Sequence, residues 1–328
     1  MAQADITADL ARNIGAERGT VGQIWFVLRR WPIIPVLVLG LLVFTGIFAD
    51  LLAPHSPFVA IPDNRNIPPV WYDPVVLNVK DASDPLAFPD PLNLGIEEAA
   101  IKYGLDPTGL DTQEAVEEAF LAIDLKPKVH FPSWDHILGG DNIGRDLLSR
   151  IIKGAQVSLT VTAISLTSGL LVGVSMGLVA GYFGGWLDEI IMRITDVWLG
   201  LPFILVAIVV VIALGQTMTI LLILLALLSW TPFVRNVRGE TLTLKERDYV
   251  ALARVAGAST FRILIWHILP GTINTVIVIA TLRVGQLILT EAILSFLGAG
   301  IPPPTPAWGA MVNDGRPFIN DAWWIAFF

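Results

Sequence analysis

Residues 248–270 read DYVALARVAGASTFRILIWHILP and lie between two long apolar segments of the chain. Up to Gly257, small and apolar residues recur at spacings of three and four, which is typical of an amphipathic helix. Glycine commonly ends a helix, Ser259 is a residue type that caps the next one, and Pro270 suits the first turn of the apolar segment that follows. The stretch therefore predicts a helical elbow between two membrane-spanning helices.

The composition around this elbow is that of a membrane protein. Of the 328 residues, 54% are hydrophobic and 15% are charged, against about 25% charged in soluble domains. A helix needs about 20 largely apolar residues to cross a bilayer, and five segments approach this length, namely 33–52, 157–182, 194–214, 218–234 and 273–296. A sixth apolar segment begins at Ala322, and the sequence stops at Phe328. We therefore expect an all-α integral membrane protein of about six transmembrane helices, the last one truncated at Phe328.

The distribution of Lys and Arg predicts the orientation, because short cytoplasmic loops are enriched in these residues. It places the N-terminus in the cytoplasm, with a cytoplasmic tail at 1–32 and a cytoplasmic loop at 236–268. The first transmembrane helix then occupies 33–54, an extracytoplasmic insert occupies 55–135, and the core of the protein occupies 136–328.

The predicted insert is strongly acidic, with fourteen Asp and Glu residues against five Lys and Arg, and the whole chain has a net charge of −8. This charge argues against nucleic acid as a partner. Two short helical patterns occupy 95–103 and 112–123, and Asp111 with Glu114 matches a capping box for the second. Two interpretations stay open for the insert, which are a solvated spacer and a docking site for a partner protein.

Four glycines in the second apolar segment recur every fourth residue and so share one helical face, where they allow another backbone to approach closely. They are Gly169, Gly173, Gly177 and Gly181.

Nothing in the sequence indicates an enzyme. It has no cysteine, no nucleophile-and-base arrangement, and no Gly-x-x-x-x-Gly-Lys-Ser/Thr pattern for an ATP phosphate. Its four histidines, at 55, 130, 136 and 267, do not form a spaced set of metal ligands. We therefore expect no catalytic residues, no metal site and no cofactor in this chain.

The elbow resembles the EAA loop of ABC importer permeases, which is Glu-Ala-Ala, three residues, Gly, nine further residues and a short ending in Leu-Pro. Ala251-Leu252-Ala253, Gly257 and Leu269-Pro270 keep that spacing. The sequence departs from the family at Ala251, where Glu is favoured, and at Leu252, where Ala is favoured.

Three further motifs extend the resemblance over most of the chain from Gly144 onward. They are GRDLLSR at 144–150, AGYFGGW at 180–186, and SFLG at 295–298 followed by Pro302-Pro303 and Trp308-Gly309. Together they are similar to the C-type permease subunit of the dipeptide, oligopeptide and nickel family. The resemblance implies a type I ABC importer permease fold, in which 136–328 is the permease core and 236–268 is its coupling loop.

The family resemblance also implies partners and a location. A second permease subunit completes a heterodimer in the prokaryotic cytoplasmic (inner) membrane, in contact with lipid. Two ATPase subunits bind ATP and Mg²⁺, and an extracytoplasmic substrate-binding protein delivers the solute. The residues expected to couple to the ATPase are Asp248, Tyr249, Ala251, Leu252, Ala253, Arg254, Gly257, Ala258 and Pro270. Within this set the resemblance implies close contact at Ala253 and Ala258, the turn at Gly257, and a polar contact at Arg254.

The fifth apolar segment, 273–296, contains Arg283, Gln286 and Glu291. A charge near the bilayer centre costs about 2.5–3.5 kcal/mol, so charged residues there seldom face lipid. Arg283 and Glu291 are eight positions apart and project about 80° apart on a helix, which allows both to point into the bundle. One interpretation is a polar lining of the translocation path, and the other is a structural contact with a neighbouring helix or subunit.

The resulting hypothesis is a permease subunit that imports peptides or peptide-like solutes, with nickel chelates or oligosaccharides as alternative cargo. A secondary transporter or channel is the alternative from another class, and a structural membrane scaffold is a third. Neither of these accounts for the elbow.

Overall fold

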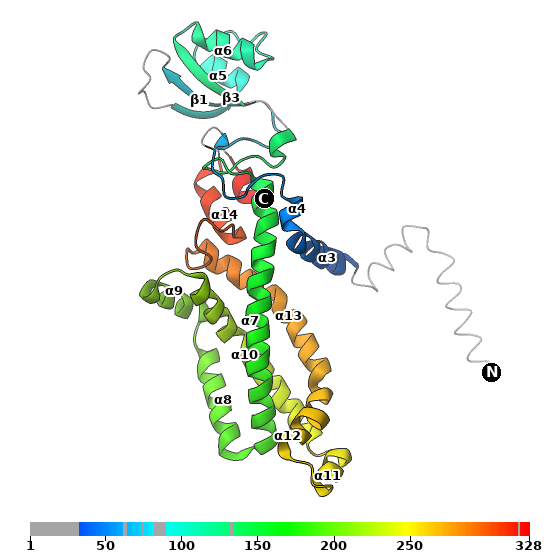
Figure 1. The fold of residues 1–328 in the computed structure, drawn as a ribbon. Helices are drawn as coiled ribbons and strands as arrows, with labels where there is room; N and C mark the ends of the chain where they lie inside the picture. Colours follow the sequence, from blue (N-terminus) through cyan, green and yellow to red (C-terminus); the bar gives the residue numbers. More distant parts are fainter. Residues whose placement is uncertain (1–32, 62–63, 74, 82–89, 131–133, 321) are drawn as a thin grey trace, which may run out of the picture.

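The computed structural model describes residues 33–328 apart from 62–63, 74, 82–89, 131–133 and 321. The predicted tail at 1–32 lies outside the described residues. Long helices run roughly along one axis, a small insert lies beyond one end of them, and the elbow lies at the other end (Figure 1). We refer to these as the insert end and the elbow end.

Two helices, α7 (Leu147–Phe183) and α10 (Met218–Leu244), form the centre of the bundle. The predicted glycine face is confirmed, because it lies against α10. A Cβ atom added at Gly173 would lie 2.6 Å from Phe233 Cβ, and one added at Gly177 would lie 2.9 Å from the carbonyl oxygen of Val234. The two helices therefore approach to a distance at which no side chain fits between them.

Among the described residues, three helical runs are long and apolar enough to cross a membrane, namely α7, α10 and the run Thr260–Phe296. The predicted continuous span at 194–214 is wrong. It divides between α8 (Gly185–Gly200) and α9 (Phe203–Leu214), which meet at 83° and count as a fourth span only as a bent pair. Pro202 explains the break, because proline disfavours helical geometry at the residue before it, and Leu201 is extended.

The first predicted span, 33–52, is also interrupted. It forms α3 (Ile33–Ile47) and the short α4 (Ala49–Leu52), with a break at Phe48. The α3 helix packs beside α7, where Gly46 lies against Leu159. The sixth apolar segment forms only the short helix α15 (Trp324–Phe327), whose buried Trp324 packs with Leu147 and with α14 (Trp308–Gly315).

The insert contains a sheet that the sequence analysis missed. Strands β1 (Val75–Asp81), β2 (Asp90–Gly95) and β3 (Leu125–His130) pair antiparallel in the order β2-β1-β3. Both edge strands contain a proline, Pro91 and Pro127, and proline is tolerated at an edge, where a strand lacks a partner on one side. Read from the sequence alone, such prolines favour an irregular loop. The sheet makes the all-α prediction wrong for the insert, while the membrane part is helical.

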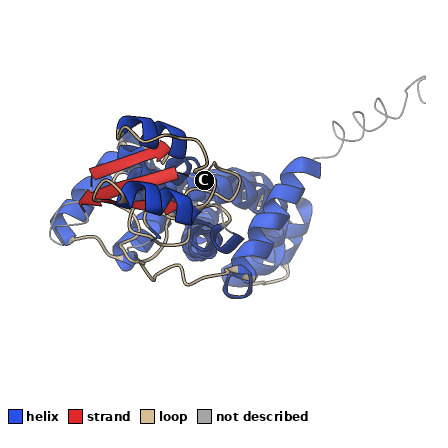
Figure 2. Ribbon diagram, turned by 90° about the horizontal axis from the view of Figure 1, so that it is seen from above, coloured by secondary structure: helices blue, strands red, loops and turns tan. Residues whose placement is uncertain are grey.

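The two predicted insert helices are confirmed as α5 (Ile96–Lys102) and α6 (Gln113–Leu121). Figure 2 looks down on the insert and shows these helices beside the strands. An irregularity in β1 between Val76 and Asn78 brings Val76 and Val79 into one core with Phe120 of α6. The predicted cap Asp111 is wrong, because the Oγ1 atom of Thr112 accepts the bond from the Ala115 N–H at 3.3 Å.

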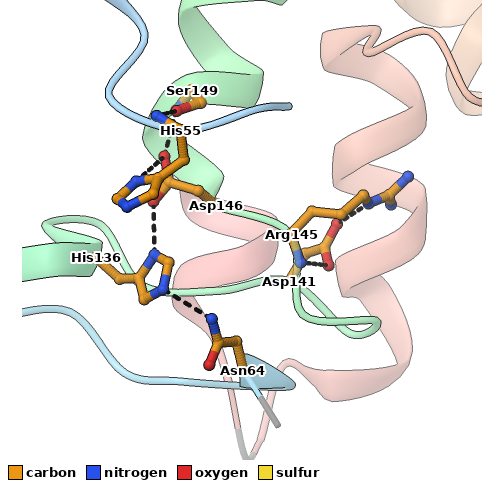
Figure 3. A network of polar contacts seen from close by, with 7 residues as sticks. All are labelled: His55, Asn64, His136, Asp141, Arg145, Asp146 and Ser149. Carbon is orange, nitrogen blue, oxygen red and sulfur yellow. Dashed lines mark hydrogen bonds and ion pairs between the residues drawn. The ribbon is translucent and has the colours of Figure 1, made fainter. Parts of the chain in front are cut away.

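The insert joins the bundle through a neck in which residues 61 and 64–67 lie beside 139–144. The Ile61 N–H donates to Gly144 and the Gly140 N–H donates to Ile67, at 3.2 and 2.9 Å. The GRDLLSR motif starts here, with Gly144 at φ 87° and Asp146 as the N-cap of α7. Arg145 Nε donates to the buried Asp141 carboxylate at 2.6 Å, which fixes the turn before the helix (Figure 3).

Candidate functional site: the elbow and a polar groove

The elbow begins with helix α11 (Asp248–Val255), which ends in a left-handed glycine turn. Gly257 has φ 79°, its N–H donates to the Arg254 carbonyl at 3.1 Å, and the Ala258 N–H donates to the Ala253 carbonyl at 3.0 Å. This pair of bonds is the Schellman motif, which satisfies the last carbonyl groups of a helix and favours glycine at the turn. The predicted helix and its break at Gly257 are confirmed.

The chain then continues into the membrane without another break. Ser259 caps α12 (Thr260–Ile263) by accepting from the Arg262 N–H at 3.4 Å, as predicted. A five-residue π-helical segment, η3 (Leu264–Ile268), links α12 to α13 (Leu269–Phe296), which has Pro270 in its first turn. The second half of the elbow and α13 therefore form one helical run, Thr260–Phe296.

The inner face of the elbow is fixed to the bundle. Val250, Ile263 and Ile268 are fully or almost fully buried in one cluster with Val174 of α7 and Val237 of α10.

The structure divides the predicted coupling residues between two faces of the elbow. Ala253 and Ala258 are half-buried against the inner cluster. The other members are exposed, namely Asp248, Tyr249, Ala251, Leu252, Arg254, Gly257 and Pro270.

The outer face of the elbow exposes large apolar side chains. Leu252 is 69% exposed, Val255 87%, Phe261 74% and Trp266 74%. The sequence analysis named only Leu252 among these. The elbow is a polar connection with several charged residues, so large apolar residues within it could have been recognised from the sequence as candidates for contact with a partner protein.

A polar groove lies in the middle of the bundle, where two cavities share Arg283 and Gln286 of α13. One, of about 220 Å³, also involves Trp198, Leu201 and Thr231 at the α8–α9 bend. The other, of about 620 Å³, has as further lining residues Pro232, Asn236, Asn274, Thr275, Val278, Ile279 and Leu282. Arg283 Nη1 donates to Gln286 Oε1 at 2.7 Å, so the guanidinium is held at the junction of the cavities.

Glu291, the third residue predicted for the path, lies elsewhere. Its side chain is fully buried between α13 and α7, where it accepts hydrogen bonds from Ser158 at 2.9 Å and Ser295 at 2.7 Å. It lines neither of the two cavities. The structure thus brings Arg283 and Gln286 together and places Glu291 in a contact between helices.

Comparison with known proteins bears on the part of the chain that contains the elbow and the groove. Residues 173–328 match the family described as binding-protein-dependent transport system inner membrane component. The chain is 45% identical over 197 residues to the glutathione transport system permease protein GsiD of Pectobacterium atrosepticum, covering 60% of this chain and 65% of that protein. It is 46% identical over 185 residues to the protein of the same name from Escherichia coli, covering 56% of this chain and 61% of that protein.

The chain thus spans less than two thirds of the length of these two relatives. Among solved structures it is similar to an inward-facing MetNI methionine ABC transporter, at 16% identity and a TM-score of 0.45. That similarity covers 55% of this chain and 88% of the other.

Proposed function

Because residues 173–328 match the family of inner membrane components of binding-protein-dependent transport systems, we propose that the whole chain is a transmembrane permease subunit of an ATP-driven importer. The observation that carries the proposal is the elbow. It is fixed to the bundle on one face, exposes Leu252 and Val255 on the other, and runs directly into α13. This is the arrangement required to pass movement from a partner to a membrane helix.

In this proposal α11 docks on an ATPase subunit, and ATP with Mg²⁺ is bound and hydrolysed by that partner. A second permease subunit completes the pathway, and an extracytoplasmic binding protein supplies the solute. Arg283 and Gln286 contribute polar groups to the path, where a guanidinium suits a carboxylate of the cargo.

Peptides or peptide-like solutes are the proposed substrate class. The two relatives are named as glutathione transport permeases, and glutathione is a peptide with free carboxylates. Nickel chelates and oligosaccharides are the alternative cargo, and mass spectrometry of the ligand bound to the cognate binding protein would decide among them.

Copurification tests the proposal directly. Tagged protein extracted from native membranes in mild detergent is expected to bring down ATPase subunits that mass spectrometry identifies. Val255→Asp, at the exposed tip of α11, is expected to reduce their recovery at least fivefold, because it introduces a charge into an apolar contact. Leu51→Asp, at an 82% exposed site on α4 at the insert end, is the matched control and should leave recovery unchanged. Absence of any ATPase from the wild-type preparation would instead favour a secondary transporter or channel.

Arg283→Leu is expected to lower ATP-dependent uptake at least tenfold while the subunits still copurify. The substitution removes the fixed cation at the junction of the two cavities, and Arg283 has its hydrogen bond within α13 itself, to Gln286. Arg283→Lys keeps the charge and should retain more uptake than the leucine variant. Loss of subunit assembly in Arg283→Leu would show that the residue holds helices or subunits together and does not line the path.

A further inference from the structure

Three potential metal ligands, His55, His136 and Asp146, meet at the insert end of α7 (Figure 3). His55 follows α4 and precedes the sheet of the insert, His136 belongs to the short helix η2 (Trp134–His136) after that sheet, and Asp146 caps α7. The three residues thus come from three separate segments of the chain. Each offers one ligand atom, and these atoms all lie within 4.8 Å of one another.

The distances are close to those of a metal centre. His136 Nδ1 lies 3.0 Å from Asp146 Oδ1, and His55 Nδ1 lies 3.9 Å from Asp146 Oδ2. Ligands at 2.0–2.2 Å from a tetrahedral ion are about 3.3–3.6 Å apart. The His136–Asp146 pair is already near this range, and His55 has to move closer to the other two ligands. His55 has room to do so, because its side chain is 42% exposed.

The surroundings hold the other two ligands in place. Asp146 is 1% exposed and its Oδ2 accepts the Ser149 N–H at 2.8 Å, while His136 is 12% exposed. His136 Nδ1 and the Ser149 N–H thus contact the two oxygens of one buried carboxylate, which fixes the orientation of the Asp146 side chain.

Asn64 supplies the outer contact that histidine ligands of metals usually have. Its side-chain nitrogen lies 2.9 Å from His136 Nε2. When Nδ1 binds an ion, Nε2 carries the proton and needs an acceptor. Rotation of the Asn64 amide by 180° presents its oxygen for this purpose. The same residue thus suits both tautomers of His136.

We propose that His55, His136 and Asp146 bind one divalent transition-metal ion, of the class of Zn²⁺, Co²⁺ or Ni²⁺. Two imidazoles and one carboxylate favour these ions over Mg²⁺ or Ca²⁺, which prefer oxygen ligands. The fourth position opens toward solvent beside His55 and takes a water molecule. The bound ion ties the chain before and after the sheet of the insert to the first turn of α7.

Cobalt binding tests the site, because Co²⁺ in a site of this type has visible d–d absorption. The full chain, purified with a tag that lacks histidine and treated with a chelator, is titrated with CoCl₂ and analysed for bound metal. One Co²⁺ per chain is expected, displaced by Zn²⁺ and not by excess Mg²⁺. His55→Gln and His136→Gln should each raise the Kd at least tenfold, and His267→Gln, at the elbow end, should leave it unchanged.

His55→Gln decides the outcome if His136→Gln fails to fold, since the only described partner of the His55 side-chain nitrogens is Asp146 at 3.9 Å. Absence of binding by the wild-type chain would show that the three residues form a hydrogen-bonded cluster only. Equal Kd values for His55→Gln and His267→Gln would also overturn the proposal.

Discussion

Gly173→Leu is expected to destabilise the chain by about 3 kcal/mol or more, the upper end of the usual effect of overpacking. The new side chain has to occupy space already filled by α10, where even a Cβ atom would lie 2.6 Å from Phe233 Cβ. The Trp230 backbone lies on the same face, so a change of side-chain rotamer cannot make room. Thermal and denaturant unfolding of the detergent-solubilised chain measures the effect.

Gly239→Leu is the matched control for this experiment. Gly239 lies inside α10, and a Cβ added there meets no atom within 4 Å. Leucine has a higher helix propensity than glycine, so this variant should be unchanged or more stable by up to about 1 kcal/mol. Equal stability of the two variants would mean that α7 and α10 are not in the close contact described above.

Gly257→Pro is expected to reduce ATP-dependent uptake at least tenfold in proteoliposomes that contain the complete transporter. Proline fixes φ near −65°, whereas Gly257 has φ 79°, and it also removes the N–H that bonds to Arg254. The end of α11 is therefore redirected. The bundle itself should remain folded, because Gly257 has no neighbouring atom within 4 Å of a built Cβ.

Gly257→Asn is the control that replaces the glycine but can keep the positive φ of the turn. Asparagine adopts positive φ more readily than other non-glycine residues, so this variant should keep most of the uptake. Both variants should have the wild-type unfolding temperature within a few degrees. Wild-type uptake by Gly257→Pro would contradict the proposed role of the elbow, whatever the substrate.

The features that could be predicted from the sequence depend on local residue patterns. Gly257 and Ser259 specify a helix end and a helix start within three residues, and the structure has both. The glycines of α7 predict a close helix contact because their four-residue period places them on one face. Each of these signals is contained in a short window of sequence.

The features that the sequence analysis missed depend on a single proline or on which strands pair in the folded insert. Residues 194–214 are apolar and long enough to cross a membrane, which predicts one straight span. Only Pro202 indicates the bend, and apolar content does not reveal it. The edge strands β2 and β3 contain prolines that indicate turns unless their place in the sheet is known.

The candidate metal ligands could not be grouped from the sequence at all. His55 and His136 lie before and after the sheet of the insert, about 80 residues apart in the sequence, and only the folded neck brings them together. Arg283 and Gln286 could be named as polar residues of a membrane helix, but their position at the junction of two cavities depends on α8, α9 and α10.

The unbroken length of α7 has a mechanical consequence. Its 37 residues form a rod of about 55 Å at a rise of 1.5 Å per residue, against a hydrocarbon core of about 30 Å. One end of the rod lies beside the elbow and the other is the Asp146 cap in the neck of the insert (Figure 1). Over this length each degree of tilt moves the far end sideways by about 1 Å. A rigid rotation of α7 by a few degrees at the elbow end would thus displace its Asp146 end by several ångströms.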